Sequence, residues 1–333
     1  MKRLVYLTIF IAAAIILSLP AMYGDDSAVL YGDQLHEPCD DPQGIPPGHI
    51  IIEGDIIVPE ISAMGIYATN LWPNGIVPYE FDPAVTSENR ARALGSMREW
   101  EMASGVDFIE RTTETNYVYL QNSNQYSSSV GMVGGKQVIN IYKWELVGKI
   151  THELGHALGL WHEQSRVDRD TYITIEWDNI TEGYEHNFNR HDEADVYGSY
   201  DFGSIMHYTQ CTFSNCTGCH DHPDPNCRVI TVNPPWDTVW QNLIGFAVVP
   251  SYLDRETMLY LYHNASWIFV NQAFGGSPQL GTFEYPYTSL NTGVTNVPTG
   301  GTVMIFPGTY SESGLYSKKM KLRAPLGGVV LDH

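Results

Sequence analysis

The fold of this 333-residue chain is decided by the stretch His152-Glu153-Leu154-Gly155-His156-Ala157-Leu158-Gly159-Leu160-Trp161-His162. On a helix, His152 and His156 lie four residues apart, so both imidazoles project from one face and can bind the same metal ion. Gly159 can leave helical geometry at little steric cost, which lets the chain turn and bring His162 back as a third ligand. Three neutral imidazole nitrogens leave a tetrahedral zinc ion with one open position, as in catalytic sites.

Glu153 follows the first of these histidines directly. It lies close enough to the metal to handle the proton of a bound water, yet it is not itself a ligand. The short pattern His-Glu-x-x-His can occur by accident on a surface helix, but the longer pattern has a chance frequency below about 10⁻⁷ per starting position. The sequence therefore predicts one Zn²⁺ per chain, held by His152, His156 and His162, with Glu153 as the general base.

Segments on both sides of this motif resemble the astacin family of metzincin zinc proteases. The resemblance covers about residues 71–262. It rests on Trp72-Pro73-Asn74-Gly75-Ile76-Val77-Pro78-Tyr79, Arg111-Thr112-Thr113, Glu163-Gln164-Ser165-Arg166-Val167-Asp168-Arg169-Asp170 and Ser204-Ile205-Met206-His207-Tyr208. It implies an α+β fold of the metzincin (zincin-like) class, with a twisted mixed sheet and an active-site helix.

The same resemblance assigns roles to three further residues. Met206 would form an apolar floor beneath the histidines, in the Met-turn of the family. Tyr208 would be a displaceable zinc ligand that swings off the metal to stabilise the oxyanion, although a buried structural tyrosine is the alternative. Glu163 would bind the new amino terminus, created near residues 61–69.

The amino end predicts export. Lys2 and Arg3 precede an apolar stretch over residues 4–19, and Pro20-Ala21 with Gly24 offers small residues for cleavage. This pattern is typical of a secretory signal over residues 1–24, and an uncleaved anchor is the alternative. We expect a secreted, extracellular protein, or a periplasmic one in a bacterium, with no stable membrane association after signal cleavage.

Composition agrees with a secreted enzyme. Apolar residues make up 43% of the chain, enough for a sizeable core and more than one domain. The net charge of −20 argues against nucleic acid and anionic membrane surfaces as partners, because both would repel it.

Residues 25–62 are interpreted as a propeptide. Within them, Ile52-Glu53-Gly54-Asp55-Ile56 resembles an element of astacin propeptides in which the aspartate fills the open zinc position. Asp55 is therefore the candidate latch, and an ordinary turn in a linker is the alternative. Cys39 is a rival latch, because a thiolate also binds zinc, but its acidic neighbours oppose thiolate formation.

Four cysteines crowd one loop after the Met-turn: Cys211, Cys216, Cys219 and Cys227. Their spacing would suit a second zinc, but an exported chain favours two local disulfides, whose pairing the sequence leaves open.

The remaining pattern predicts strands over residues 76–81, 106–110, 117–121 and 138–142, and helices from Ser87 to about Ser104 and over about 145–158. Ala93, Met97, Trp100 and Ser104 form the buried stripe of the first helix. Residues 127–133 suit an exposed edge to which an extended peptide could add. The catalytic domain is placed at residues 63–265. Residues 266–333 are predicted to be all-β, either as the first rungs of a pectin-lyase-like parallel β-helix or as a small appendage.

These observations predict a secreted zinc metalloendopeptidase that hydrolyses polypeptides with a zinc-bound water activated by Glu153, and that is latent until propeptide removal. The alternative is a catalytically weak, zinc-containing binding module targeted by its C-terminal β-segment. The retained Glu153 argues against that alternative, since a pure binder needs no general base. No oligomeric state is predicted.

Overall fold

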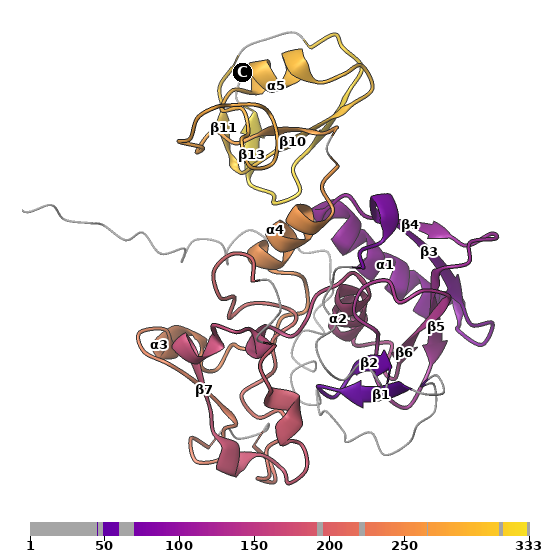
Figure 1. Cartoon of the computed structure of the whole chain (residues 1–333), viewed down its shortest axis with the longest axis vertical. Helices are drawn as coiled ribbons and strands as arrows, with labels where there is room; N and C mark the ends of the chain where they lie inside the picture. Colours follow the sequence, from indigo (N-terminus) through magenta and orange to yellow (C-terminus); the bar gives the residue numbers. More distant parts are fainter. Residues whose placement is uncertain are drawn as a thin grey trace, which may run out of the picture. The chain divides into compact units, whose positions relative to one another are not determined.

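The computed structural model describes residues 45, 49–59, 70–191, 196–219, 224–264, 266–312 and 316–331. The predicted signal segment and Cys39 lie outside these ranges. In the described ranges no helix combines the length and the apolar character that a membrane crossing requires. Figure 1 shows the elements in chain order, from the β1–β2 hairpin to the α5–β13 segment.

A four-stranded sheet in the order β4-β3-β5-β6 forms the frame of the first half of the catalytic region. Its strands are β3 (Ile76–Phe81), β4 (Asp107–Glu110), β5 (Tyr117–Asn122) and β6 (Lys136–Ile141). Each paired strand runs parallel to its neighbour. A mixed sheet was expected. Among the described residues, antiparallel pairing to this sheet is limited to an isolated bridge between Ser127 and Asn140 of β6. All four predicted strands are present, with ends shifted by at most two residues.

Two helices pack with this sheet: α1 (Ser87–Ala103) and α2 (Val147–Ala157), drawn in Figure 1. The side chain of Thr86 caps α1 by accepting a hydrogen bond from the Asn89 N–H. The predicted stripe is buried, and Trp100 has no exposed surface. Its Nε1 donates to the Thr151 carbonyl at 2.9 Å, which fixes α1 against the helix that carries the first two histidines.

The second half of the catalytic region has little regular structure. Its strands β7 (Ile173–Ile175) and β8 (Ile230–Val232) pair antiparallel. Its α-helices are α3 (Asp237–Trp240) and α4 (Tyr252–Leu261). Short 3₁₀ turns occur in both halves: η2 (Pro73–Gly75) in the first, and η3 (Glu163–Ser165), η4 (Arg169–Thr171), η5 (Trp177–Asn179) and η6 (Glu185–Phe188) in the second.

The predicted pair of local disulfides is present in this half. Cys211 bonds to Cys219 and Cys216 to Cys227, so these four cysteines do not form a second zinc site.

A hairpin made of β1 (His49–Ile52) and β2 (Ile56–Pro59) precedes the catalytic region. Its turn has positive φ at Glu53 (48°) and Gly54 (77°). The hairpin adds to the edge at Ser128, whose carbonyl accepts from Ile57 N–H and whose N–H donates to Asp55 O, both at 2.8 Å. The prediction that this edge is exposed is wrong for this form of the chain, because the hairpin covers it and Ser127, Ser128 and Ser129 are buried.

The C-terminal segment is β-rich, with β9 (Ile268–Val270), β10 (Thr302–Ile305), β11 (Gly308–Tyr310), β12 (Lys321–Arg323) and β13 (Val329–Leu331). These strands pair parallel, in the orders β12-β10-β9 and β11-β13. The prediction of an all-β segment is wrong in one respect, because α5 (Leu290–Asn296) lies between β9 and β10. Ser289 starts this helix by accepting a hydrogen bond from Thr292 N–H.

Candidate metal centre and active site

Three histidines converge at the carboxyl end of α2. His152 and His156 lie one turn apart on the helix. At Gly159 (φ 109°) the chain leaves the helix, and His162 returns to the same point. A side chain larger than glycine would be strained in this conformation. The turn predicted at Gly159 is therefore present.

The hydrogen bonds of each imidazole fix its tautomer. The Nδ1 of His152 donates to the Ile205 carbonyl at 2.7 Å, and the Nδ1 of His156 donates to the Leu160 carbonyl at 2.8 Å. The Nδ1 of His162 lies 2.7 Å from a carboxylate oxygen of Glu53. Nδ1 is the donor in each of these bonds, so Nε2 is the ring nitrogen that faces the site and that would bind a metal in the neutral imidazole.

The Nε2 atoms face one another at close range. Those of His152 and His156 are 3.1 Å apart, and those of His152 and His162 are 3.2 Å apart. Lone pairs at this separation repel unless a cation lies between them. A tetrahedral zinc ion with ligands at about 2.0–2.1 Å needs neighbouring ligand atoms about 3.3–3.4 Å apart. The three nitrogens therefore fit such an ion.

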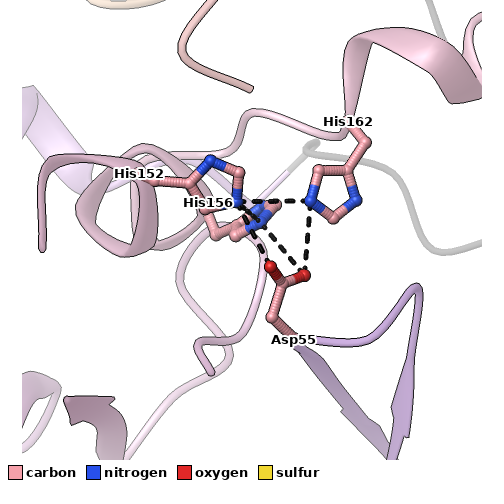
Figure 2. A group of neighbouring side chains, drawn as sticks. All are labelled: Asp55, His152, His156 and His162. Carbon is pink, nitrogen blue, oxygen red and sulfur yellow. Dashed lines mark hydrogen bonds and ion pairs between the residues drawn. The ribbon is translucent and has the colours of Figure 1, made fainter. Parts of the chain in front are cut away.

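Asp55 supplies the remaining atoms of this cluster. Figure 2 shows its carboxylate at the end of the hairpin turn, pointing at the three imidazoles. Its oxygens lie 3.3 Å from Nε2 of His152, 3.6 Å from Nε2 of His156 and 3.3 Å from Nε2 of His162. Burial alone would raise the pKa of Asp55, but the charge of His162 and the hydrogen bonds of the histidines hold that pKa well below its usual value. An ionised carboxylate thus stands where a fourth ligand of the metal would stand.

Glu153 is fully buried beside this cluster. Neither of its carboxylate oxygens has a hydrogen-bond partner among the described residues. Burial raises the pKa of Glu153 well above its usual value, and the negative charge of Asp55 adds to the shift. A buried, unpaired carboxylate is costly. The raised pKa favours the protonated, neutral form of this side chain, which lessens that cost.

Met206 packs against α2 at Gly155. A methyl group at Gly155 would lie 2.8 Å from Met206 Sδ, so glycine is required for this close approach. Met206 is 2% exposed. Its role as an apolar floor beneath the histidines stays a prediction.

Tyr208 is also buried at the site, with its ring centroid 4.5 Å from that of His162. Its hydroxyl donates to the main-chain carbonyl of Glu53 in a very short hydrogen bond. Burial, followed by the charge of Asp55, raises its pKa well above 10, so the phenol keeps its proton. The hydroxyl is thus a hydrogen-bond donor, and its partner is the hairpin.

Glu163 lies next to the third histidine and accepts from the Asp201 N–H at 2.7 Å, with Arg166 Nη1 at 3.2 Å. Burial raises its pKa to about 8, against the opposing charge of Arg166.

Sequence reasoning missed three residues that contact or support this centre. Glu53 contacts His162, and His191 in turn contacts Glu53. Asp254, on α4, accepts from Ser204 Oγ at 2.6 Å and from Ile205 N–H at 2.9 Å. Because Ile205 O in turn accepts from His152, Asp254 supports a candidate ligand through the Met-turn. The capping pattern Ser251-x-x-Asp254 could have predicted the start of α4, but not this contact.

Residues 65–263 match the sequence model of the family Astacin (Peptidase family M12A). The chain belongs to the astacin family. High choriolytic enzyme 2 of Oryzias latipes is 33% identical over 209 residues, which cover 59% of this chain and 75% of that protein. Tolloid-like protein 1 of Homo sapiens is 42% identical over 150 residues, which cover 43% of this chain and 15% of that protein.

A solved structure shares the fold. High choriolytic enzyme 1, a hatching enzyme zinc-protease from Oryzias latipes, superposes with a TM-score of 0.53 at 32% sequence identity, covering 60% of this chain and 98% of that one. The predicted family and the predicted α+β fold are thereby confirmed, as is the prediction of a zinc metalloendopeptidase.

Proposed function

We propose that this astacin-family chain is an exported endopeptidase that is held latent by its own amino-terminal segment. In this proposal residues 1–24 are the signal, 25–62 the propeptide, 63–265 the catalytic domain and 266–333 a β-rich extension. The observation that carries the proposal is the cluster of Asp55 with His152, His156 and His162, whose ligand atoms all lie within 4.8 Å of one another.

The three histidines would hold the zinc ion. When bound, zinc lowers the pKa of a coordinated water to near 7 and supplies positive charge for the transition state. Glu153 accepts the proton of the attacking water and delivers it to the departing amine. Its burial and raised pKa favour both transfers. The Tyr208 hydroxyl donates a hydrogen bond to the developing oxyanion once Glu53 has withdrawn.

Asp55 keeps the chain latent in this proposal. Its carboxylate occupies the fourth ligand direction, so water cannot enter there until the hairpin leaves. The structure does not describe Cys39, so its rival role is tested only by experiment. Asp55→Ala should raise the casein cleavage of the unprocessed chain above that of the parent, whereas Cys39→Ala should leave it unchanged.

Glu163 has a separate proposed role after activation. Its side chain is largely buried, the negative charges of Asp201 and Asp254 help to raise its pKa, and Arg166 is the neighbouring cation. A new amino terminus formed near residues 61–69 would add a positive charge to this acidic group. Amino-terminal sequencing of the processed protein would give the cleavage point on which this role depends.

The parallel pairing of β10 with β9 and β12, and of β11 with β13, supports the proposal that residues 266–333 begin a parallel β-helix. β10 and β11 are joined by a two-residue corner, and β12 and β13 pair with them in the same order.

The decisive test is casein hydrolysis by the processed protein, with zinc measured in the same sample. We expect one zinc per chain, loss of cleavage on treatment with phenanthroline, and a fall of about 10²–10⁴-fold for Glu153→Ala at unchanged zinc content. Glu145→Ala is the matched control, since Glu145 is an exposed carboxylate just before α2. A processed protein that holds no stoichiometric metal and cuts no casein would refute the proposal.

A further inference from the structure

The side chain of Glu53, two residues before Asp55, is 2% exposed and lies inside the site. One carboxylate oxygen lies 2.7 Å from Nδ1 of His162, and the other makes a very short contact with Nε2 of His191. Its main-chain carbonyl accepts the Tyr208 hydroxyl. All three contacts are made to side chains of the catalytic domain.

The backbone of Glu53 has φ 48°, which non-glycine residues other than Asn and Asp adopt infrequently. A backbone of this kind persists when the surrounding contacts compensate for it. Glu53 therefore does more than form the turn, since glycine or asparagine would serve a turn equally well.

The catalytic domain holds His191 ready for this contact. Its N–H donates to the Ser165 carbonyl at 2.8 Å, and its ring lies 4.2 Å from that of Trp161. Both partners flank His162 in the chain. One carboxylate thus joins two histidines of the catalytic domain.

We propose that Glu53 is a second latch of the latent chain, one that holds the hairpin through protein contacts instead of through the metal. The inference rests on the latency proposed above. The hold exerted by Asp55 depends on an ion at the Nε2 cluster, whereas Glu53 binds Nδ1 of His162 on the other side of the ring. The main-chain carbonyl of Glu53 also accepts the hydrogen bond of the Tyr208 hydroxyl, so this hydroxyl cannot donate to an oxyanion while the hairpin is docked. The hairpin should therefore stay docked when zinc is lost.

Hydrogen–deuterium exchange of residues 49–59 in the full chain tests this proposal. The chain would carry Glu153→Ala to prevent self-processing, and exchange would be measured with zinc and after chelation. Glu53→Gln should speed exchange by at least about tenfold in both states, because the negative charge is lost and the amide nitrogen cannot accept a hydrogen bond from the second histidine. Asp55→Asn should speed exchange of the hairpin more in the presence of zinc than after chelation, because the hold of Asp55 depends on the ion. Glu145→Gln is the matched control and should change nothing.

A double-mutant cycle assigns the effect to the proposed partner. His191→Phe keeps a ring against Trp161 but removes Nε2, so adding Glu53→Gln to it should speed exchange by much less than Glu53→Gln does alone. Exchange within α2 reports whether each variant is folded. If Glu53→Gln unfolds the domain, His191→Phe decides in its place and should by itself speed exchange of the hairpin.

Exchange of the hairpin within twofold of the parent in a folded Glu53→Gln chain would overturn the proposal. So would equal effects of Glu53→Gln in the presence and in the absence of the His191→Phe substitution. Failure of the proposed function can be told apart from failure of the Glu53 latch. The first appears as inactivity of the processed parent protein, and it leaves the exchange results unaffected.

Discussion

Replacing Asp254 with alanine should destabilise the chain strongly. The carboxylate is 6% exposed and accepts hydrogen bonds from Ser204 Oγ, Ile205 N–H and Ser251 N–H at 2.6, 2.9 and 2.8 Å. Hydrogen bonds to a charged group contribute about 1.5–3 kcal/mol each, and donors that share one acceptor do not add fully. We therefore expect a loss of about 3–5 kcal/mol, a large part of the typical total of about 5–15 kcal/mol.

Urea unfolding of the full chain, followed by tryptophan fluorescence in a Glu153→Ala background, measures this loss. Competition with a chelator gives a second readout. Because Ile205 O orients His152, zinc affinity should also fall by about tenfold. Glu256→Ala, on the same helix, is the control and should change stability by about 0.5 kcal/mol or less. A loss below about 1 kcal/mol for Asp254→Ala, with unchanged zinc affinity, would refute the reasoning.

Three further outcomes are expected. Tyr208→Phe should lower kcat of the processed enzyme by about 10²-fold at unchanged zinc content, measured by steady-state kinetics, because one oxyanion donor is lost. Burial, and then the charge of Asp254, raises the pKa of Asp201 to about 6. The pKa of Asp201 in the folded chain thus exceeds the value of about 4 in the unfolded chain. The stability that Asp201 contributes is therefore present below about pH 4 and is lost as the pH rises through about 6. Asp201→Asn should remove that part of the slope in urea unfolding between about pH 4 and 7.5. Replacing Cys216 and Cys227 by serine should reduce stability by about 3 kcal/mol in the same assay, as expected for a sequence separation of 11.

Much of the catalytic frame follows from local sequence. The stripe of α1 repeats at helical spacing, and the strand ends are marked by glycine, proline and asparagine, so both are set by neighbours in the chain. The three histidines converge for the same reason, because a helix turn and one glycine are enough to bring them together. A resemblance to a known family supplied Met206, Tyr208 and Asp55, which spacing alone would not have located.

The contacts that sequence reasoning missed join residues far apart in the chain. Glu53 and His191 are 138 positions apart, and Asp254 lies 49 positions from Ile205. Nothing in the local pattern of a Glu-Gly turn or of a capped helix reveals a partner at such a distance. α5 was missed for a different reason: its seven residues include glycine, threonine and asparagine, which are weak helix formers, so its start depends on the Ser289 cap.

The error at residues 127–133 bears on how the hairpin lies in the site. That edge was expected to bind an extended peptide, and β2 binds it, with a parallel bridge between Ile56 and Ser128. In this arrangement the main-chain carbonyl of Asp55 accepts from Ser128 N–H at 2.8 Å, while its side chain faces the histidines. The carbonyl is therefore engaged at the edge and not presented to Glu153. The hairpin thus lies along the proposed substrate edge with a carboxylate, and not a peptide bond, at the three histidines.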